Sequence, residues 1–157
     1  MTRYLTLLLL LASPTAFAQG AWFTVLGDAA NPAINTIQVD PVPVEITGDT
    51  RKLRVRVSRS ADRTSWDGVQ YRSYDSTVLF DCVNNTARYV QIHYYKQPAW
   101  QGSLYKSVNY GGVVPRWMQF REVEPNPNER IVQAACGASR VAAAPASAAA
   151  PASRPKR

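Results

Sequence analysis

The sequence has little of what most enzymes use for catalysis. It contains one histidine, His93, and two cysteines, Cys82 and Cys136. It has no G-x-S-x-G nucleophile motif, no G-x-x-x-x-G-K-[ST] phosphate loop and no G-x-G-x-x-G fingerprint. We therefore predict no enzyme activity, no catalytic residue, no metal site and no cofactor. A small hydrolase that uses His93 is the catalytic alternative, with Ser103 and Ser107 as nearby hydroxyls, but a surface or structural histidine fits the strand around it better.

Beyond its start, the chain lacks an apolar run of the ~20 residues that a membrane-spanning helix needs. The start itself has the order of a secretory signal: a basic residue at Arg3, an apolar run over Leu5–Ala12, and small residues at Ala16 and Ala18. We predict a signal peptide over 1–18 and export to the periplasm, the cell surface or the medium. No cysteine stands at the predicted cleavage site, so a lipid anchor is not expected.

The two cysteines form an even pair in a chain with a predicted export signal. In an oxidising compartment such a pair favours one disulfide, here Cys82 with Cys136. A metal site would need more ligands than one histidine adds, and a catalytic thiol would need a free sulfur. The disulfide is the prediction, and those two alternatives stay open at this point.

The part of the chain that is expected to fold carries little net charge. The whole chain carries a formal charge of +7, but residues 138–157, rich in Ala, Pro and Ser, hold four of its bases and no acid. Without these and Arg3, about +2 remains. We predict a disordered basic tail over 138–157 and no nucleic-acid partner. The tail could contact an anionic envelope polymer.

Residues 19–137 are long enough for one domain. The clearest strand has Leu53, Val55 and Val57 alternating with polar residues. The polar positions place Lys52, Arg54 and Arg56 in a row on one face. Such a row could bind a protein, an anionic polymer or a glycan, and it could equally be a solvated face. It is the candidate binding face.

Other segments predict further strands and one helix. In the segment from Arg88, alternation predicts Val90, Ile92 and Tyr94 on one face and Tyr89 and His93 on the other. Asn126, Pro127 and Glu129 predict the start of a helix, and Gly137 its end. The remaining strands are expected at Trp22–Leu26, Val42–Ile46, Val69–Tyr74, Thr77–Cys82 and Trp117–Phe120, with a polar loop over Ser60–Gly68.

These pieces resemble the surface-adhesin protein E-like family of Gram-negative bacteria. The residues that carry the likeness are an early tryptophan, the strand Leu53–Val57, the stretch Tyr71–Tyr74 leading through Phe80 to the Asp81-Cys82 pair, Arg88-Tyr89-Val90, and the closing helix with Cys136. The resemblance implies an α+β fold: a small antiparallel sheet with a C-terminal helix on one face and a stapling disulfide. It also implies a surface or periplasmic role, with adhesion to host extracellular proteins in the founding type, which is lipid-anchored.

The residues and the resemblance together predict an exported, non-enzymatic binding protein, possible partners being host or envelope macromolecules. The alternative is a periplasmic structural or envelope-maintenance protein whose basic tail contacts anionic polymer. The sequence does not predict an oligomeric state.

Overall fold

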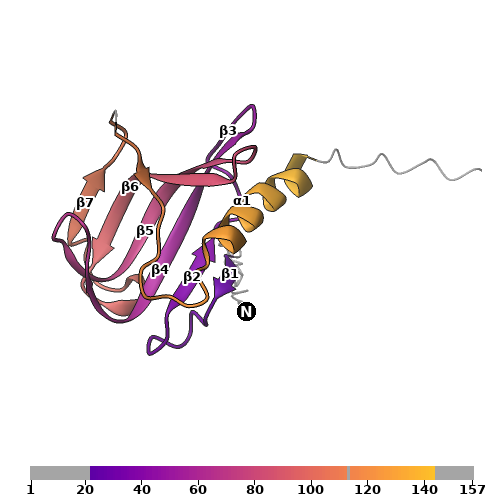
Figure 1. The fold of residues 1–157 in the computed structure, drawn as a ribbon. Coiled ribbons are helices and arrows are strands. Elements are labelled where there is room, and N and C mark those ends of the chain that lie inside the picture. Colours follow the sequence, from indigo (N-terminus) through magenta and orange to yellow (C-terminus); the bar gives the residue numbers. More distant parts are fainter. Residues whose placement is uncertain (1–21, 113, 144–157) are drawn as a thin grey trace, which may run out of the picture.

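The computed structural model of the chain describes residues 22–112 and 114–143, without the side chains of 138–143. Within these residues, eight strands form one antiparallel sheet; six follow the order β1-β2-β4-β5-β6-β7, while β3 pairs with β4 and β8 with β6. One α-helix follows (Figure 1). The α+β class is thus confirmed. The elements are β1 (Phe23–Leu26), β2 (Thr36–Val39), β3 (Glu45–Thr47), β4 (Thr50–Thr64), β5 (Gln70–Asp81), β6 (Thr86–Tyr95), a 3-10 turn η1 (Pro98–Trp100), β7 (Lys106–Asn109), β8 (Arg116–Trp117) and α1 (Asn128–Ala143).

Strand β4 has the predicted alternation. Leu53, Val55 and Val57 are fully buried, whereas Arg54 is exposed and Arg56 is half-buried. We call the face that carries Leu53 and Val57 the inner face and the opposite one the outer face. The inner face holds most of the hydrophobic core.

Strand β4 is longer than predicted, because it continues through the polar stretch expected to be a loop and ends at Thr64. Its register with β5 shifts between Ser58 and Arg63. Arg72 bridges this irregular part: its Nε donates to the carbonyl of Arg59 (2.7 Å) and its Nη2 to that of Ser60 (2.8 Å). Alternating polarity in a sequence indicates which side chains are buried. It could not predict this part of β4, whose backbone carbonyls are hydrogen-bonded by the Arg72 side chain.

The two strands predicted over Val69–Tyr74 and Thr77–Cys82 are one strand, β5. The polar pair between them, Asp75 and Ser76, stays in the sheet. Ser76 is buried, and its hydroxyl donates to the carbonyl of Val55 at 2.8 Å. A serine satisfied in this way does not interrupt a buried strand.

The predicted faces of β6 are wrong at its first half. Tyr89 is buried on the inner face together with Ile92 and Tyr94, while Val90 is only partly buried. The cause is a β-bulge: Gln91 pairs with Thr77 and Tyr89 with Val78, so that Val90 is the extra residue. One inserted residue reverses the face of every side chain on one side of it.

The sequence did not predict β2 or β7. All four residues of β2 are buried, because the strand lies between β1 and β4. Strand β7 lies between the strand predicted from Arg88 and the one predicted at Trp117–Phe120, where no strand was expected. Of the predicted strand Val42–Ile46, only the end belongs to β3, which forms a tight hairpin with β4.

Helix α1 starts as predicted and ends later. The backbone N–H of Asn128 donates to Asn126 Oδ1 at 3.0 Å, and Ile131 and Ala135 are fully buried. Gly137 does not end the helix, which continues to Ala143, so residues 138–143 of the predicted tail are helical. Gly137 is exposed, and a helix interior tolerates glycine at a cost of about 1 kcal/mol. The signal peptide and residues 144–157 lie outside the described residues.

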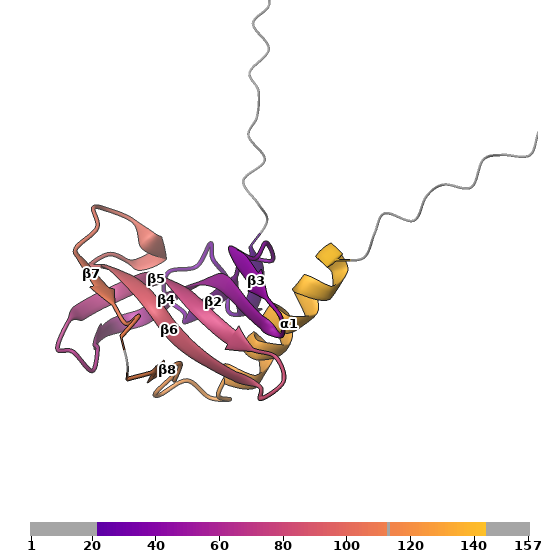
Figure 2. The same ribbon diagram turned by 90° about the horizontal axis from the view of Figure 1, so that it is seen from above.

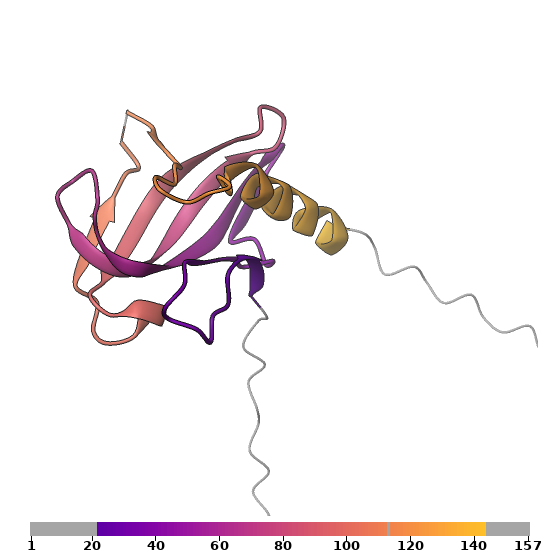
Figure 3. The ribbon, with the colours of Figure 1, turned by 60° about the horizontal axis from the view of Figure 1, so that its bottom comes forward.

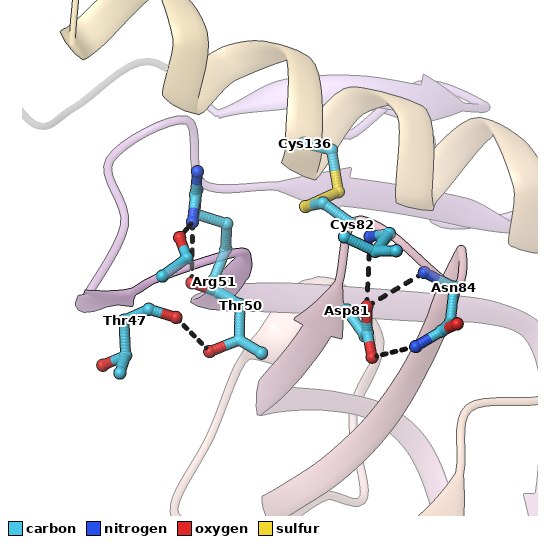
Figure 4. Close-up of a disulfide and its surroundings, with 9 residues drawn as sticks. Thr47, Thr50, Arg51, Asp81, Cys82, Asn84 and Cys136 are labelled. Carbon is cyan, nitrogen blue, oxygen red and sulfur yellow. Dashed lines mark hydrogen bonds between the residues drawn. A yellow bond between two sulfur atoms is a disulfide. The ribbon is translucent and has the colours of Figure 1, made fainter.

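The predicted disulfide between Cys82 and Cys136 is confirmed; it joins the end of β5 to α1, with 5.8 Å between the Cα atoms (Figure 4). The turn after β5 is organised by Asp81. Its Oδ1 accepts from the backbone N–H groups of Val83 (3.1 Å) and Asn84 (3.0 Å), and its Oδ2 from the Asn84 amide (2.7 Å). These hydrogen bonds, those of Asn84 first, hold the pKa of Asp81 below its usual value. The Asp81-Cys82 pair therefore sets both the turn and the covalent attachment of the helix.

Helix α1 covers only part of the inner face. It contacts β1, β2, β4 and β5 at one end of the sheet, and β7 lies at the other end (Figure 2). The segment that follows β8 crosses the uncovered part (Figure 1). None of the described helices is long and apolar enough to cross a membrane.

Candidate binding face

The sheet register builds a polar row across the outer face. Gln38, Arg56, Asp75, His93 and Ser107 are successive cross-strand partners on β2, β4, β5, β6 and β7. Directly opposed residues have Cβ atoms roughly 5 Å apart. Side chains that are far apart in the sequence therefore lie side by side on this face.

Arg56 is the member of the row with the most extensive aromatic contacts, because its guanidinium lies between two indole rings. Its Cζ is 4.1 Å from the ring centroid of Trp22 and 4.1 Å from that of Trp100. Its Nε donates to Gln38 Oε1 at 2.7 Å. No described carboxylate lies within ion-pair distance of Arg56. Burial, and then the charge of Arg54, lowers its pKa.

Trp100 is held in place by a strained turn. Ala99 and Trp100 have φ values of 53° and 59°, in the left-handed region that residues other than glycine seldom adopt. Hydrogen bonds hold them there: Ala99 N–H donates to Ser58 Oγ (3.0 Å), and Trp100 donates from its backbone to Ser73 Oγ (3.0 Å) and from Nε1 to the Tyr74 carbonyl (2.9 Å). Such strain costs of order 1–3 kcal/mol per residue and collects at functional sites.

The predicted row of bases does lie on one face, but its members differ in what they contact. Lys52 forms an ion pair with Glu45, which lowers the pKa of that carboxyl. Arg54 pairs with the buried Asp40, its Nε donating to Oδ2 at 3.0 Å. Of these three bases, Arg56 alone forms no ion pair with a described carboxylate. Within the predicted row, Arg56 is thus the base that is not already ion-paired, although Asp40 and Asp75 act on its charge from a distance.

The register also brings Asp75, His93 and Ser107 together, the residue types of a hydrolase triad. Other partners take up two of the three: Asp75 Oδ2 accepts from the Tyr95 hydroxyl (2.8 Å), and Ser107 Oγ accepts from Gln91 Nε2 (3.4 Å). No hydrogen bond links the three among the described residues. A working triad needs the nucleophile–base and base–carboxylate bonds, so this geometry is not that of an assembled triad.

Sequence reasoning did not connect either indole with Arg56. Trp22 and Trp100 are far from Arg56 in the sequence, and nothing local indicates that they meet it. The available signal was the mixture of aromatic and basic residues along the chain, which also produces a contact between Lys96 and the ring of Tyr105 at 4.1 Å. The described residues hold no group of three His, Cys, Asp or Glu side chains that could bind a metal ion.

An antiparallel sheet with a disulfide-tied C-terminal helix and an arginine stacked between indoles on its open face defines a small β-rich domain with a polar outer face. The family described as surface-adhesin protein E matches residues 22–137, and the chain belongs to that family. The family resemblance seen in the sequence is thereby confirmed. No curated protein and no solved structure matches the chain.

Proposed function

We propose that the protein is an exported, non-enzymatic binding protein whose outer face contacts an acidic macromolecule through Arg56, Trp22 and Trp100. The observation that carries this proposal is the stacked guanidinium of Arg56, which has no described carboxylate partner. Membership of a family named for a surface adhesin supports a binding role and export. A host matrix component or an envelope polymer with carboxylate or sulfate groups has the matching chemistry.

The physical case rests on the properties of arginine. A guanidinium remains charged at all physiological pH values and presents N–H groups in a plane that matches carboxylate or sulfate oxygens. Stacking between two rings fixes the orientation of that plane before binding, so less conformational entropy is lost on contact. Arg54 and Lys52 extend the same face, but each already has an acid partner, so we assign them minor roles.

The experiment is a binding series with the purified, disulfide-bonded protein on immobilised heparin and on acidic extracellular-matrix protein. Arg56→Gln removes the free charge, and Lys106→Gln removes one charge from an exposed position on β7 as the matched control. We expect at least tenfold weaker binding for Arg56→Gln and little change for Lys106→Gln. Equal losses for the two variants would reduce the effect to unspecific charge and reject the proposal.

A second measurement decides where the face is presented. Protease treatment of intact cells should remove the protein if it is displayed at the surface. Full protection behind the outer membrane would leave only envelope polymers as partners and would favour the periplasmic alternative. Deletion of residues 144–157 tests that alternative, because unchanged envelope association would remove the basic tail from the interaction.

A further inference from the structure

A cavity of about 440 Å³ opens on the inner face where α1 does not cover the sheet. Tyr71, Tyr74 and Tyr94 line it from β5 and β6, and Trp117 and Phe120 line it from the segment that crosses these strands (Figure 1). This volume is within the range of small-molecule sites, about 300–1,000 Å³. The cavity lies on the face opposite the Arg56 stack, so it is a separate site.

One residue of the cavity lining is a buried cation that has no ion pair among the described residues. Arg59 is only 4% exposed, and its Nη2 donates to the backbone carbonyl of Arg121 at 2.9 Å. Its Nε is buried with no hydrogen-bond partner, and no described carboxylate is within ion-pair distance. A buried charge is costly unless it is paired. A ligand anion would supply the missing partner.

Each of the two acids that line the cavity faces an arginine other than Arg59. Glu122 forms an ion pair with Arg63, and Asp62 is exposed, 3.9 Å from Arg72. Of the four arginines in the lining, Arg63 faces Glu122 and Arg116 faces Asp67, whereas Arg59 and Arg121 have no ion pair among the described residues. Burial raises the pKa of Tyr71, and the positive charge of Arg59 partly offsets this rise. The charge of Arg59 is therefore felt at the aromatic lining. The electrostatic balance of the cavity therefore favours a negative group.

The rest of the lining favours an apolar body. The rings of Tyr71 and Tyr94 lie 5.2 Å apart, and those of Tyr71 and Tyr74 lie 5.5 Å apart. Trp66, on the β4–β5 connection that runs beside β7 (Figure 3), stands at the rim with Arg116 over its ring at 5.2 Å. It remains 42% exposed. Aromatic walls beside a buried cationic group favour a ligand with a flat or apolar body and one anionic end.

We propose that this cavity binds the carboxylate end of a small aromatic molecule or chain terminus, with the Arg59 guanidinium as its counter-ion. Two sources share this chemistry: a free aryl carboxylic acid, and the C-terminal carboxylate of a peptide that ends in an aromatic residue. The site does not depend on the outer face.

The test compares acids with their neutral amides. Phenylacetate is titrated against phenylacetamide, and Ala-Ala-Phe against its C-terminal amide, by calorimetry and by tryptophan fluorescence of the disulfide-bonded protein. We expect the acid to bind at least tenfold more tightly than the amide in one pair, and the tighter pair identifies the source. Equal affinities of acid and amide, or no binding of any probe up to 10 mM (roughly the Kd at which binding contributes under 3 kcal/mol), would overturn the proposal.

Two variants secure the assignment. Arg59→Gln should abolish the preference for the acid, whereas Arg56→Gln on the outer face should leave it unchanged. If Arg59→Gln fails to fold by circular dichroism, Trp117→Ala serves instead, because it removes an exposed ring from the lining and should weaken acid and amide alike. An acid preference that survives in folded Arg59→Gln, or acid and amide affinities unchanged in Trp117→Ala, would place the ligand elsewhere. Failure of the outer-face proposal would leave these results intact.

Discussion

The hydroxyl groups of Tyr74 and Tyr89 lie 2.9 Å apart in the buried interior, on the neighbouring strands β5 and β6. Burial raises the pKa of both phenols, so each stays neutral and one donates to the other. The bulge at Val90 makes this contact possible, because it turns Tyr89 inward. The pair places a hydrogen bond between two side chains inside a largely hydrophobic cluster of described residues.

This pair predicts a strongly non-additive mutant cycle. Tyr74→Phe or Tyr89→Phe alone leaves a buried hydroxyl without its partner and should lower the free energy of unfolding by about 1–3 kcal/mol. The double variant removes both hydroxyls and should recover much of that loss. Urea denaturation of the four proteins measures the coupling. Additive losses would show that the two hydroxyls are satisfied independently.

The disulfide should account for a large share of the stability. Replacing Cys82 and Cys136 by alanine opens a loop with a sequence separation of 54 and should lower the free energy of unfolding by about 4 kcal/mol in the chain-entropy model. Equilibrium denaturation with and without reductant measures the loss. The reductant should bring the native protein to the level of the double variant and leave that variant unchanged.

Substitution of alanine at two glycines should change the stability of the protein in opposite directions, although both sites have room for a methyl group. Neither Gly137 nor Gly48 has an atom within 4 Å of an added Cβ, but Gly48 has a φ of +53° and Gly137 lies in α1. Gly137→Ala should stabilise the protein by up to about 1 kcal/mol through helix propensity. Gly48→Ala should destabilise it by about 1–2 kcal/mol, because alanine is strained at positive φ. Thermal unfolding compares them, and a destabilised Gly137→Ala would contradict a helix through that position.

Ionisation of Tyr95 is expected to lower the stability of the protein at alkaline pH. Burial, and then the hydrogen bond to Asp75, raises its pKa from 10.0 to about 12. A folded-state pKa above the unfolded one stabilises the protein below about pH 10, and this contribution disappears between pH 10 and 12. The stability difference between the native protein and Tyr95→Phe should therefore shrink from pH 9 to pH 11.

Asp75→Asn provides the control for that prediction. It removes the charge that disfavours the phenolate, so the pKa of Tyr95 should fall toward its ordinary value. Absorbance at 295 nm follows the phenolate directly. An unchanged titration in Asp75→Asn would mean that burial alone sets the pKa of Tyr95.

The sequence was informative where one segment determines its own environment. The alternation at Leu53–Val57 identified the inner face, the cysteine pair identified the disulfide, and Asn126 identified the start of the helix. Each of these signals is local or depends on composition.

The features that define the two candidate sites are non-local. The stack at Arg56 needs Trp22 and Trp100 from distant segments, and the burial of Arg59 depends on a chain segment that returns across the inner face. The bulge at Val90 reversed the expected face of Tyr89, since alternation assumes an uninterrupted register. Periodicity gives no information about such contacts.

The outermost strands of the sheet, β1 and β7, are far shorter than the central ones, at four residues each against 15 in β4 and 12 in β5. A β-strand of a second molecule could therefore pair with only a few free backbone N–H and C=O groups at either edge of the sheet. The short edge strands thus disfavour edge-to-edge pairing of sheets into fibres.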